Sequence, residues 1–105
     1  MAIHETNDAR LPDFVCNNQR VIVKFTGKEC AKCEELAPAY LDLSEQEDYS
    51  GIRFLKLDAE DNPIASKEVS QHGTPFIAAY RNGDLIGQQL AASKADMIKM
   101  LNSLL

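Results

Sequence analysis

The residues of this sequence best suited to chemistry are two cysteines separated by two residues, Cys30 and Cys33. Thiolates are nucleophiles and metal ligands, so a pair at this spacing is typical of thiol–disulfide exchange or of half a zinc site. The apolar, β-branched run at residues 21–25 predicts a buried strand, and apolar spacing over residues 30–47 predicts a helix. The cysteine pair is therefore expected at the N-terminus of a helix that follows a buried strand.

A cysteine in that position has surroundings that favour its thiolate. The first N–H groups of a helix have no intrahelical acceptor, and the helix dipole places about half a positive charge there. We therefore expect the pKa of Cys30 to lie below that of an ordinary thiol. Cys33 comes one turn later and should be less accessible. This predicts Cys30 as the attacking nucleophile and Cys33 as the thiol that resolves the mixed disulfide.

Other interpretations of the pair stay open. A zinc site would need two more ligands, and the other soft ligands are His4, Cys16 and His72, with no second close pair. We therefore expect no metal. Inert core cysteines are disfavoured by the charged residues around the pair, and a binding module without catalysis is the remaining alternative.

Length and composition limit the class of protein. The 105 residues predict a single domain, 1–105, with ordinary globular composition. Eleven Lys and Arg against 16 Asp and Glu give a net charge of −5, which argues against nucleic-acid binding. No apolar run approaches the roughly 20 residues of a membrane span, and the first residues lack signal-peptide features. We expect a cytoplasmic monomer that does not bind membranes, with cysteines that do not form a disulfide framework.

The elements that must position the pair follow from periodicity and turn signals. Strands are predicted at residues 21–25, 52–57, 76–80 and 85–90, helices at 8–17, 30–47, 63–69 and from 93 onward, with an optional leading strand at 2–5. Asn62 and Pro63 predict a helix start, Asn82-Gly83 predicts a tight hairpin, and Ser93 predicts a cap. Helical crossovers give parallel strands and the hairpin an antiparallel pair. The fold class is α/β, a mixed sheet of four to five strands flanked by helices on both faces.

Together these residues resemble the thioredoxin family, clearly over residues 21–104 and loosely before them. The matching motifs are the strand at 21–25, Cys30-Ala31-Lys32-Cys33, Pro38, Lys56-Leu57-Asp58, Asn62-Pro63, Gly73-Thr74-Pro75 and Arg81-Asn82-Gly83-Asp84. The resemblance implies the thioredoxin fold and reduction of protein disulfides through a Cys30/Cys33 dithiol–disulfide cycle. The alternatives are an oxidase or isomerase of the same fold, or a non-catalytic interaction module.

The resemblance also implies partners and a binding surface. No bound cofactor is implied, and electrons would come from NADPH through a thioredoxin-reductase-type flavoprotein. The Thr74–Pro75 bond would be cis, with its loop facing the cysteines. The backbone of Thr74 would hydrogen-bond an extended substrate segment, with Ala31 and Lys32 completing the substrate-binding surface.

Several residues depart from the family pattern. Ala31-Lys32 stands where Gly-Pro is usual, Thr26 and Glu29 occupy places usual for tryptophan, and Leu90 replaces a groove-lining glycine. Lys32 is expected to favour the thiolate. Leu90 is expected to narrow the docking surface.

Lys24 is the sharpest departure, because the family places a buried aspartate there. It is expected either to stabilise a thiolate and lower the thiol pKa values, or to reach the surface or pair with Asp58 or Glu34 without a catalytic role. His72 is expected near the cysteines, either as a solvated loop histidine or as a group that tunes them.

Overall fold

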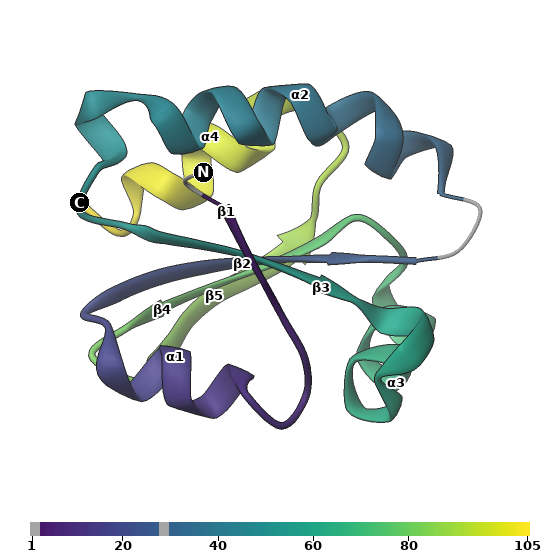
Figure 1. The fold of residues 1–105 in the computed structure, drawn as a ribbon. Helices are drawn as coiled ribbons and strands as arrows, with labels where there is room; N and C mark the ends of the chain where they lie inside the picture. The colour runs from purple at the N-terminus through teal and green to yellow at the C-terminus, as the bar shows by residue number, and fades with distance from the viewer. Residues whose placement is uncertain (1–2, 28–29) are drawn as a thin grey trace.

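The computed structural model describes residues 3–27 and 30–105, apart from the side chain of His72. Over these residues the chain forms a five-stranded mixed sheet in the order β1-β3-β2-β4-β5, with helices on both faces (Figure 1). The strands are β1 (Ile3–Thr6), β2 (Arg20–Thr26), β3 (Arg53–Asp58), β4 (Phe76–Arg81) and β5 (Asp84–Leu90). The helices are α1 (Leu11–Asn17), α2 (Ala31–Glu45), α3 (Pro63–His72) and α4 (Lys94–Asn102), with 3₁₀ turns at Glu47–Tyr49 and Ala59–Asp61. This is the predicted α/β architecture.

The optional leading strand is present over its described residues and adds the fifth strand. β1 pairs in parallel with β3, with Ile3 opposite Phe54. β4 pairs antiparallel with both β2 and β5. The predicted hairpin turn is also confirmed: Asn82 and Gly83 have φ of 53° and 88°, the left-handed region that a two-residue hairpin turn of this kind requires.

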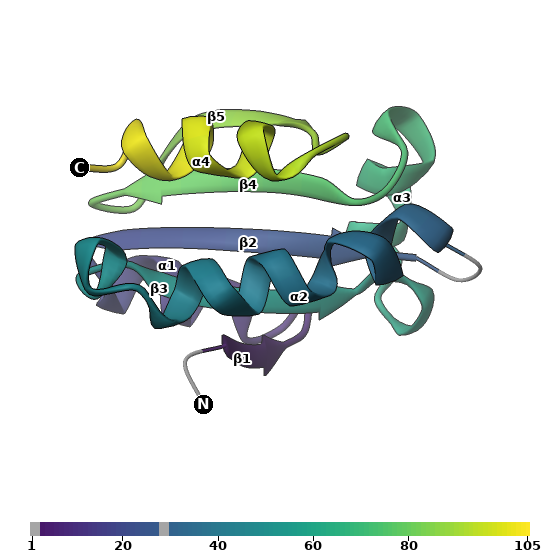
Figure 2. The same ribbon diagram turned by 90° about the horizontal axis from the view of Figure 1, so that it is seen from above.

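The sheet separates two hydrophobic layers, with α2 and α4 over one face and α1 and α3 over the other (Figures 1 and 2). Ile22 of β2 packs with Tyr40 of α2, whereas Val21 and Val23 belong to the opposite cluster. Successive side chains of a strand point to opposite faces. Lys24, two residues after Ile22, therefore faces α2, the helix that begins at the cysteine pair.

The start of α3 departs from the expected cap. Asn62 is the N-cap residue, but its side chain makes no capping hydrogen bond and donates to the Asp58 carbonyl at 2.7 Å instead. The carboxylate of Asp8 accepts the N–H groups of Ile64 at 2.7 Å and Ala65 at 3.1 Å. A carboxylate is a charge-assisted acceptor at the positive end of a helix dipole. The segment after β1 thus caps a helix more than 50 residues away in sequence.

The bounds of three helices also differ from the expected ones, and α3 continues to His72, past its expected end at residue 69. α1 begins at Leu11 rather than at Asp8, with Pro12 in its first turn. α2 ends at Glu45, and the 3₁₀ turn follows. The predicted cap of α4 is confirmed: the Ser93 side chain accepts the Asp96 N–H, and the Asp96 carboxylate accepts the Ala92 N–H at 2.8 Å.

Candidate active site

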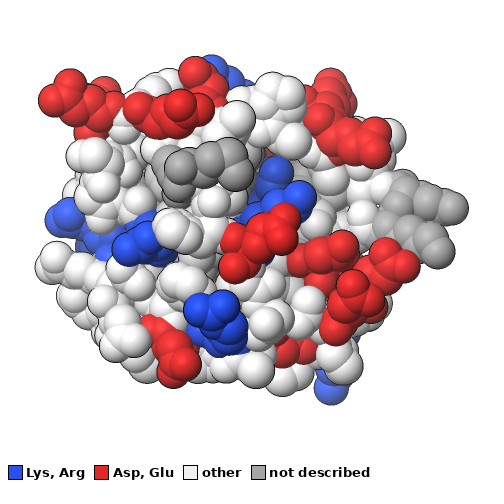
Figure 3. Space-filling model, viewed as in Figure 1, with Lys and Arg blue, Asp and Glu red and all other residues white. Residues whose placement is uncertain are grey.

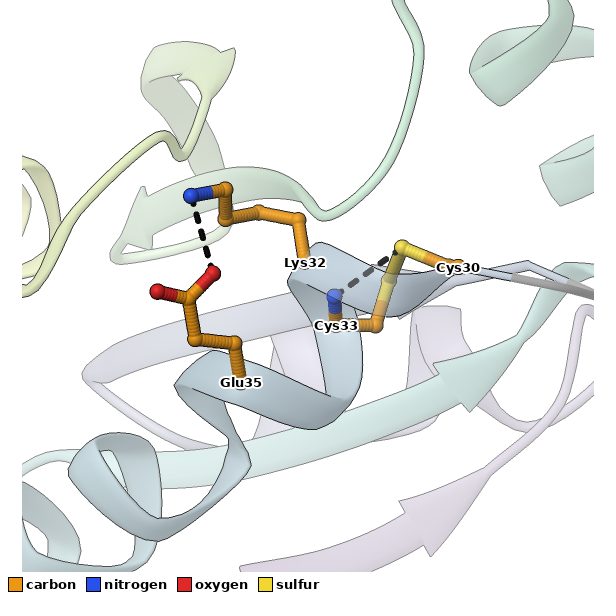
Figure 4. The surroundings of a disulfide bond; sticks show 4 residues. All are labelled: Cys30, Lys32, Cys33 and Glu35. Atoms are coloured by element: carbon orange, nitrogen blue, oxygen red, sulfur yellow. Dashed lines mark hydrogen bonds and ion pairs between the residues drawn. A yellow bond between two sulfur atoms is a disulfide. The ribbon is translucent and has the colours of Figure 1, made fainter.

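A disulfide joins Cys30 and Cys33 at the start of α2, with the two Cα atoms 5.2 Å apart (Figure 4). Cys30 is the N-cap residue of the helix, with φ −99° and ψ 94°. Its Sγ accepts the backbone N–H of Cys33 at 3.0 Å. The sulfur thus occupies the position in which a serine or aspartate oxygen commonly caps a helix. After reduction, a negative charge on this atom would face the unpaired N–H groups of the helix.

The two sulfur-bearing residues differ in access to solvent. Cys30 is half-buried, whereas Cys33 is only 6% exposed. Thiol–disulfide exchange requires an incoming sulfur to reach the sulfur that it attacks. A partner can therefore approach Cys30, while Cys33 is largely covered.

The two residues between the cysteines are exposed. The Lys32 ammonium lies 2.9 Å from the Glu35 carboxylate, one turn along α2 (Figure 4). This exposed ion pair places a negative charge beside the Lys32 ammonium at the helix surface.

The loop before β4 lies beside the segment that leads to the cysteines. The Thr74–Pro75 peptide bond is cis, as the resemblance implied. A Cβ on Gly27, just after β2, would be 3.2 Å from the Thr74 side chain. The Pro75 carbonyl accepts the Ala91 N–H at 2.8 Å, which ties the loop to the end of β5.

A pocket of about 250 Å³ lies beside the disulfide. Both cysteines line it together with side chains from β2, β3 and α2. The other lining residues are Lys24, Thr26, Gly27, Glu34, Ala37, Lys56 and Asp58.

Lys24 is buried against this cavity, with 3% of its surface exposed. Its Nζ lies 4.7 Å from the ring centroid of Tyr40, a cation–π contact. The Tyr40 hydroxyl donates to the Leu55 carbonyl at 2.7 Å, which holds the ring in place. Burial, together with the positive charge of Lys56, lowers the pKa of Lys24 from 10.5 to about 8.

This placement corrects two of the expectations for Lys24. The side chain does not extend to the surface, because strand alternation directs it under α2. Within the described residues, no ion pair joins it to Asp58 or Glu34. Its ammonium contacts the aromatic ring of Tyr40 instead.

The structure places two of the remaining candidate residues, and two others fall outside the described part of the chain. Leu90 is 48% exposed, and its Cδ1 would be 3.3 Å from a Cβ on Gly73, so it flanks the loop that contains Pro75. Cys16 is an exposed free cysteine on α1, across the sheet from α2. Glu29 and the His72 side chain are outside the described residues.

Lys56 was not singled out as a functional residue from sequence. It stands opposite Lys24 in the parallel pairing of β2 and β3 and is half-buried. The sequence pattern that could have indicated it is a single lysine between Leu55 and Leu57 in an apolar strand. This pattern predicts which face of the strand Lys56 is on, but not which residues that face contacts.

Among the described side chains, no three His, Cys, Asp or Glu residues gather as metal ligands would. Across the same residues, no helix has the length and apolar character needed to span a bilayer.

Two cysteines at the N-terminus of a helix can alternate between a disulfide and a dithiol. This is the chemistry of the thiol–disulfide oxidoreductases.

Comparisons with known proteins point to the same class. A family model described as thioredoxin matches residues 2–103. A thioredoxin of Ictalurus punctatus is 30% identical over 82 residues, which are 78% of this chain and 77% of that protein. Thioredoxin-1 of Schizosaccharomyces pombe is 26% identical over 92 residues, 88% of this chain and 87% of that protein.

Solved structures show the same fold. Thioredoxin f from spinach chloroplast superimposes with a TM-score of 0.86 at 22% identity, covering 98% of this chain and 93% of that one. A Schistosoma mansoni thioredoxin pre-protein gives 0.85 at 25% identity and covers all of both chains. The chain belongs to the thioredoxin family. It is a protein-disulfide reductase of the thioredoxin type, with Cys30–Cys33 as its redox-active disulfide.

Proposed function

We propose that Cys30 is the attacking nucleophile and that Cys33 resolves the mixed disulfide during reduction of protein substrates. The Cys30 thiolate attacks one sulfur of the substrate disulfide, and the other substrate sulfur leaves as a thiolate that takes a proton. Cys33 then attacks Cys30 Sγ, which releases the second substrate thiolate and forms the Cys30–Cys33 disulfide. Two electrons pass from the protein to the substrate. The observation that carries this assignment is the half-buried Cys30 sulfur, which accepts a helix N–H, next to a covered Cys33.

The substrate segment is proposed to bind across Thr74, Pro75, Ala31 and Lys32. Support comes from the contact between Thr74 and the segment after β2, and from the exposure of both residues between the cysteines. An extended peptide beside Thr74 could use backbone hydrogen bonds, a recognition mode that tolerates many side chains.

The oxidised pair must be reduced before the next cycle, and the protein is proposed to work without a bound cofactor. We assign this step to a thioredoxin-reductase-type flavoprotein that draws on NADPH, on the strength of the family. The exposed free thiol of Cys16 suits a reducing compartment, which supports the cytoplasm as the location. A related yeast protein is named as mitochondrial.

The protein is proposed to act as a monomer on protein disulfides and not on nucleic acid. Its net charge is −5. On the face drawn in Figure 3, basic side chains of the described residues form separate groups among acidic ones. A nucleic-acid surface needs a continuous cluster of cations to neutralise phosphates.

Insulin reduction with dithiothreitol as the electron source tests the proposed function. We expect the parent protein to accelerate insulin precipitation well above the dithiothreitol background, and Cys16→Ser to match the parent. If the folded parent with both thiols intact showed only the background rate, a non-catalytic interaction module would replace this proposal.

The variant Cys33→Ser tests the division of labour between the cysteines. Because the resolving sulfur is missing, the mixed disulfide on Cys30 should accumulate, and turnover should fall by at least about a hundredfold. Non-reducing electrophoresis and intact mass measurement would detect the adduct. The trap is best built in a Cys16→Ser background, where Cys30 is the one thiol left, and the absence of an adduct in that variant would contradict the assignment.

A further inference from the structure

The pocket beside the disulfide also contains a pair of lysines. Lys24 of β2 and Lys56 of β3 stand opposite each other in the sheet, and both line the cavity that the two cysteines share. Lys24 is the only buried charged side chain in the part of the chain that the structure describes. The roles proposed above for Cys30 and Cys33 leave this pair unused.

The surroundings of Lys24 make its ammonium easy to deprotonate. From β3 it faces the half-buried Lys56 and the exposed Asp58, and its partner on β4, Ile77, brings no charge. Burial of an ammonium is costly unless a counter-charge compensates it. Burial and the Lys56 charge lower the pKa of Lys24 to about 8, so part of the population carries an uncharged amine near neutral pH.

Helix α2 supplies the remaining groups. Tyr40 presents its ring to the ammonium, and the exposed Glu34 lines the cavity together with Cys30 and Cys33. An exposed carboxylate is a much weaker base than a thiolate and is a poor acceptor for a thiol proton. A buried amine with a lowered pKa is better matched to a thiol.

Cys33 needs such an acceptor. With 6% of its surface exposed, its thiol has little access to water, and burial disfavours the thiolate. Yet Cys33 must lose its proton to attack the mixed disulfide. Transfer to an amine in the same cavity would create an ammonium–thiolate pair in which each charge stabilises the other.

We propose that the Lys24 amine accepts the thiol proton of Cys33 as Cys33 attacks the mixed disulfide, and that Lys56 tunes this exchange as a positioning residue. This proposal rests on the roles proposed above for the two cysteines. The proton moves from Cys33 Sγ to Lys24 Nζ, and the freed electron pair forms the Cys33–Cys30 bond. The bond from Cys30 to the substrate sulfur breaks, and the substrate leaves as a thiolate that is then protonated. The Lys24 ammonium returns its proton to solvent, so no other oxidant or reductant is needed.

Stopped-flow reaction with 5,5′-dithiobis(2-nitrobenzoate) separates the two steps. In a reduced Cys16→Ser background, the first release of thionitrobenzoate reports attack by Cys30, and the second reports resolution by Cys33. We expect Lys24→Met to slow the second phase at pH 7 by at least about tenfold, within the usual range for loss of a general base. In Lys24→Met, the pH profile of the second phase should also lose its midpoint near pH 8. The first phase should change by less than about threefold, because Cys30 is held by the helix N-terminus.

Two further variants separate proton transfer from charge alone. Lys24→Arg keeps a positive charge but cannot be deprotonated, so its second phase should stay slow. Lys56→Met should move the midpoint of the profile to higher pH and leave the high-pH plateau unchanged. A second phase that is unchanged in Lys24→Met, or restored by Lys24→Arg, would overturn the proposal. Failure of the proposed function would give a different result. Either the first phase would be absent, or the Cys33→Ser variant would still show the second phase.

Discussion

Replacing Cys30 by serine is expected to abolish disulfide reduction while leaving the fold intact. The Cys30 sulfur supplies the nucleophile, and loss of a nucleophile that acts in concert with a partner commonly lowers turnover by about a thousandfold or more. The same atom accepts the Cys33 N–H as the helix cap. A serine oxygen is a preferred acceptor in that position, so α2 should keep its cap. Insulin reduction should therefore fall to the dithiothreitol background.

The control for this result is Cys16→Ser, which removes an exposed thiol from α1 and should retain full activity. Thermal unfolding of both variants in the reduced state should stay close to that of the reduced parent. Alkylation by iodoacetamide across a range of pH should show one thiol of lowered pKa in Cys16→Ser and none in the Cys16→Ser/Cys30→Ser double variant. Residual activity of Cys30→Ser above about a tenth of the parent rate would contradict the assignment.

Replacing Lys24 by methionine is expected to make the protein more stable at pH 7. The side chain is 3% exposed, and its pKa falls from the ordinary value of 10.5 to about 8 in the folded state. At pH 7 the lysine is fully protonated in the unfolded state and mostly protonated in the folded state, so the fold bears most of the cost of the buried charge. This cost is about 3 kcal/mol, and a methionine of similar shape avoids it.

The same difference in pKa makes the stability of the parent depend on pH. Between about pH 8 and 10.5 the unfolded chain binds the lysine proton and the folded chain does not, so the free energy of unfolding should rise with pH. Burial raises the pKa values of Tyr40 and Tyr80, which removes stability again once the unfolded tyrosines ionise. The useful window is therefore about pH 8 to 10.

Urea unfolding of the oxidised proteins across this window checks both statements. The gap between Lys24→Met and the parent should be largest at pH 7 and should shrink as pH rises toward 10. Lys56→Met is the matched control, because it removes a half-buried lysine from the same cavity and should give a much smaller gap. A parent that is more stable than Lys24→Met at pH 7 would show that the Tyr40 contact outweighs the burial of the charge.

Much of the site was predictable because it depends on short-range order. The position of Cys30 at the start of a helix follows from the apolar period of residues 30–47 and from the preceding strand. The hairpin at Asn82-Gly83 and the cap of α4 at Ser93 depend on residues within one turn of each other. In each case the physical cause acts over a few residues, so the sequence alone contains it.

Contacts between distant segments were decided only in the folded chain. Asp8, rather than Asn62, caps the N–H groups of Ile64 and Ala65, because the segment after β1 returns to the start of α3. The sequence offered Asp58 and Glu34 as partners for Lys24, since both are carboxylates near the predicted site. The ring of Tyr40 takes that place instead, and Lys56 is the charged neighbour.

The reason is that burial and charge depend on which elements face each other. The alternation of β2 determines that Lys24 and Ile22 share a face, but it does not say which helix covers that face. Only the packing of α2 over that face of the sheet (Figure 1) brings Lys24 and Cys33 to one pocket. The sequence therefore determined the reactive sulfurs and their helix, whereas the tertiary structure decided which buried amine lies beside them.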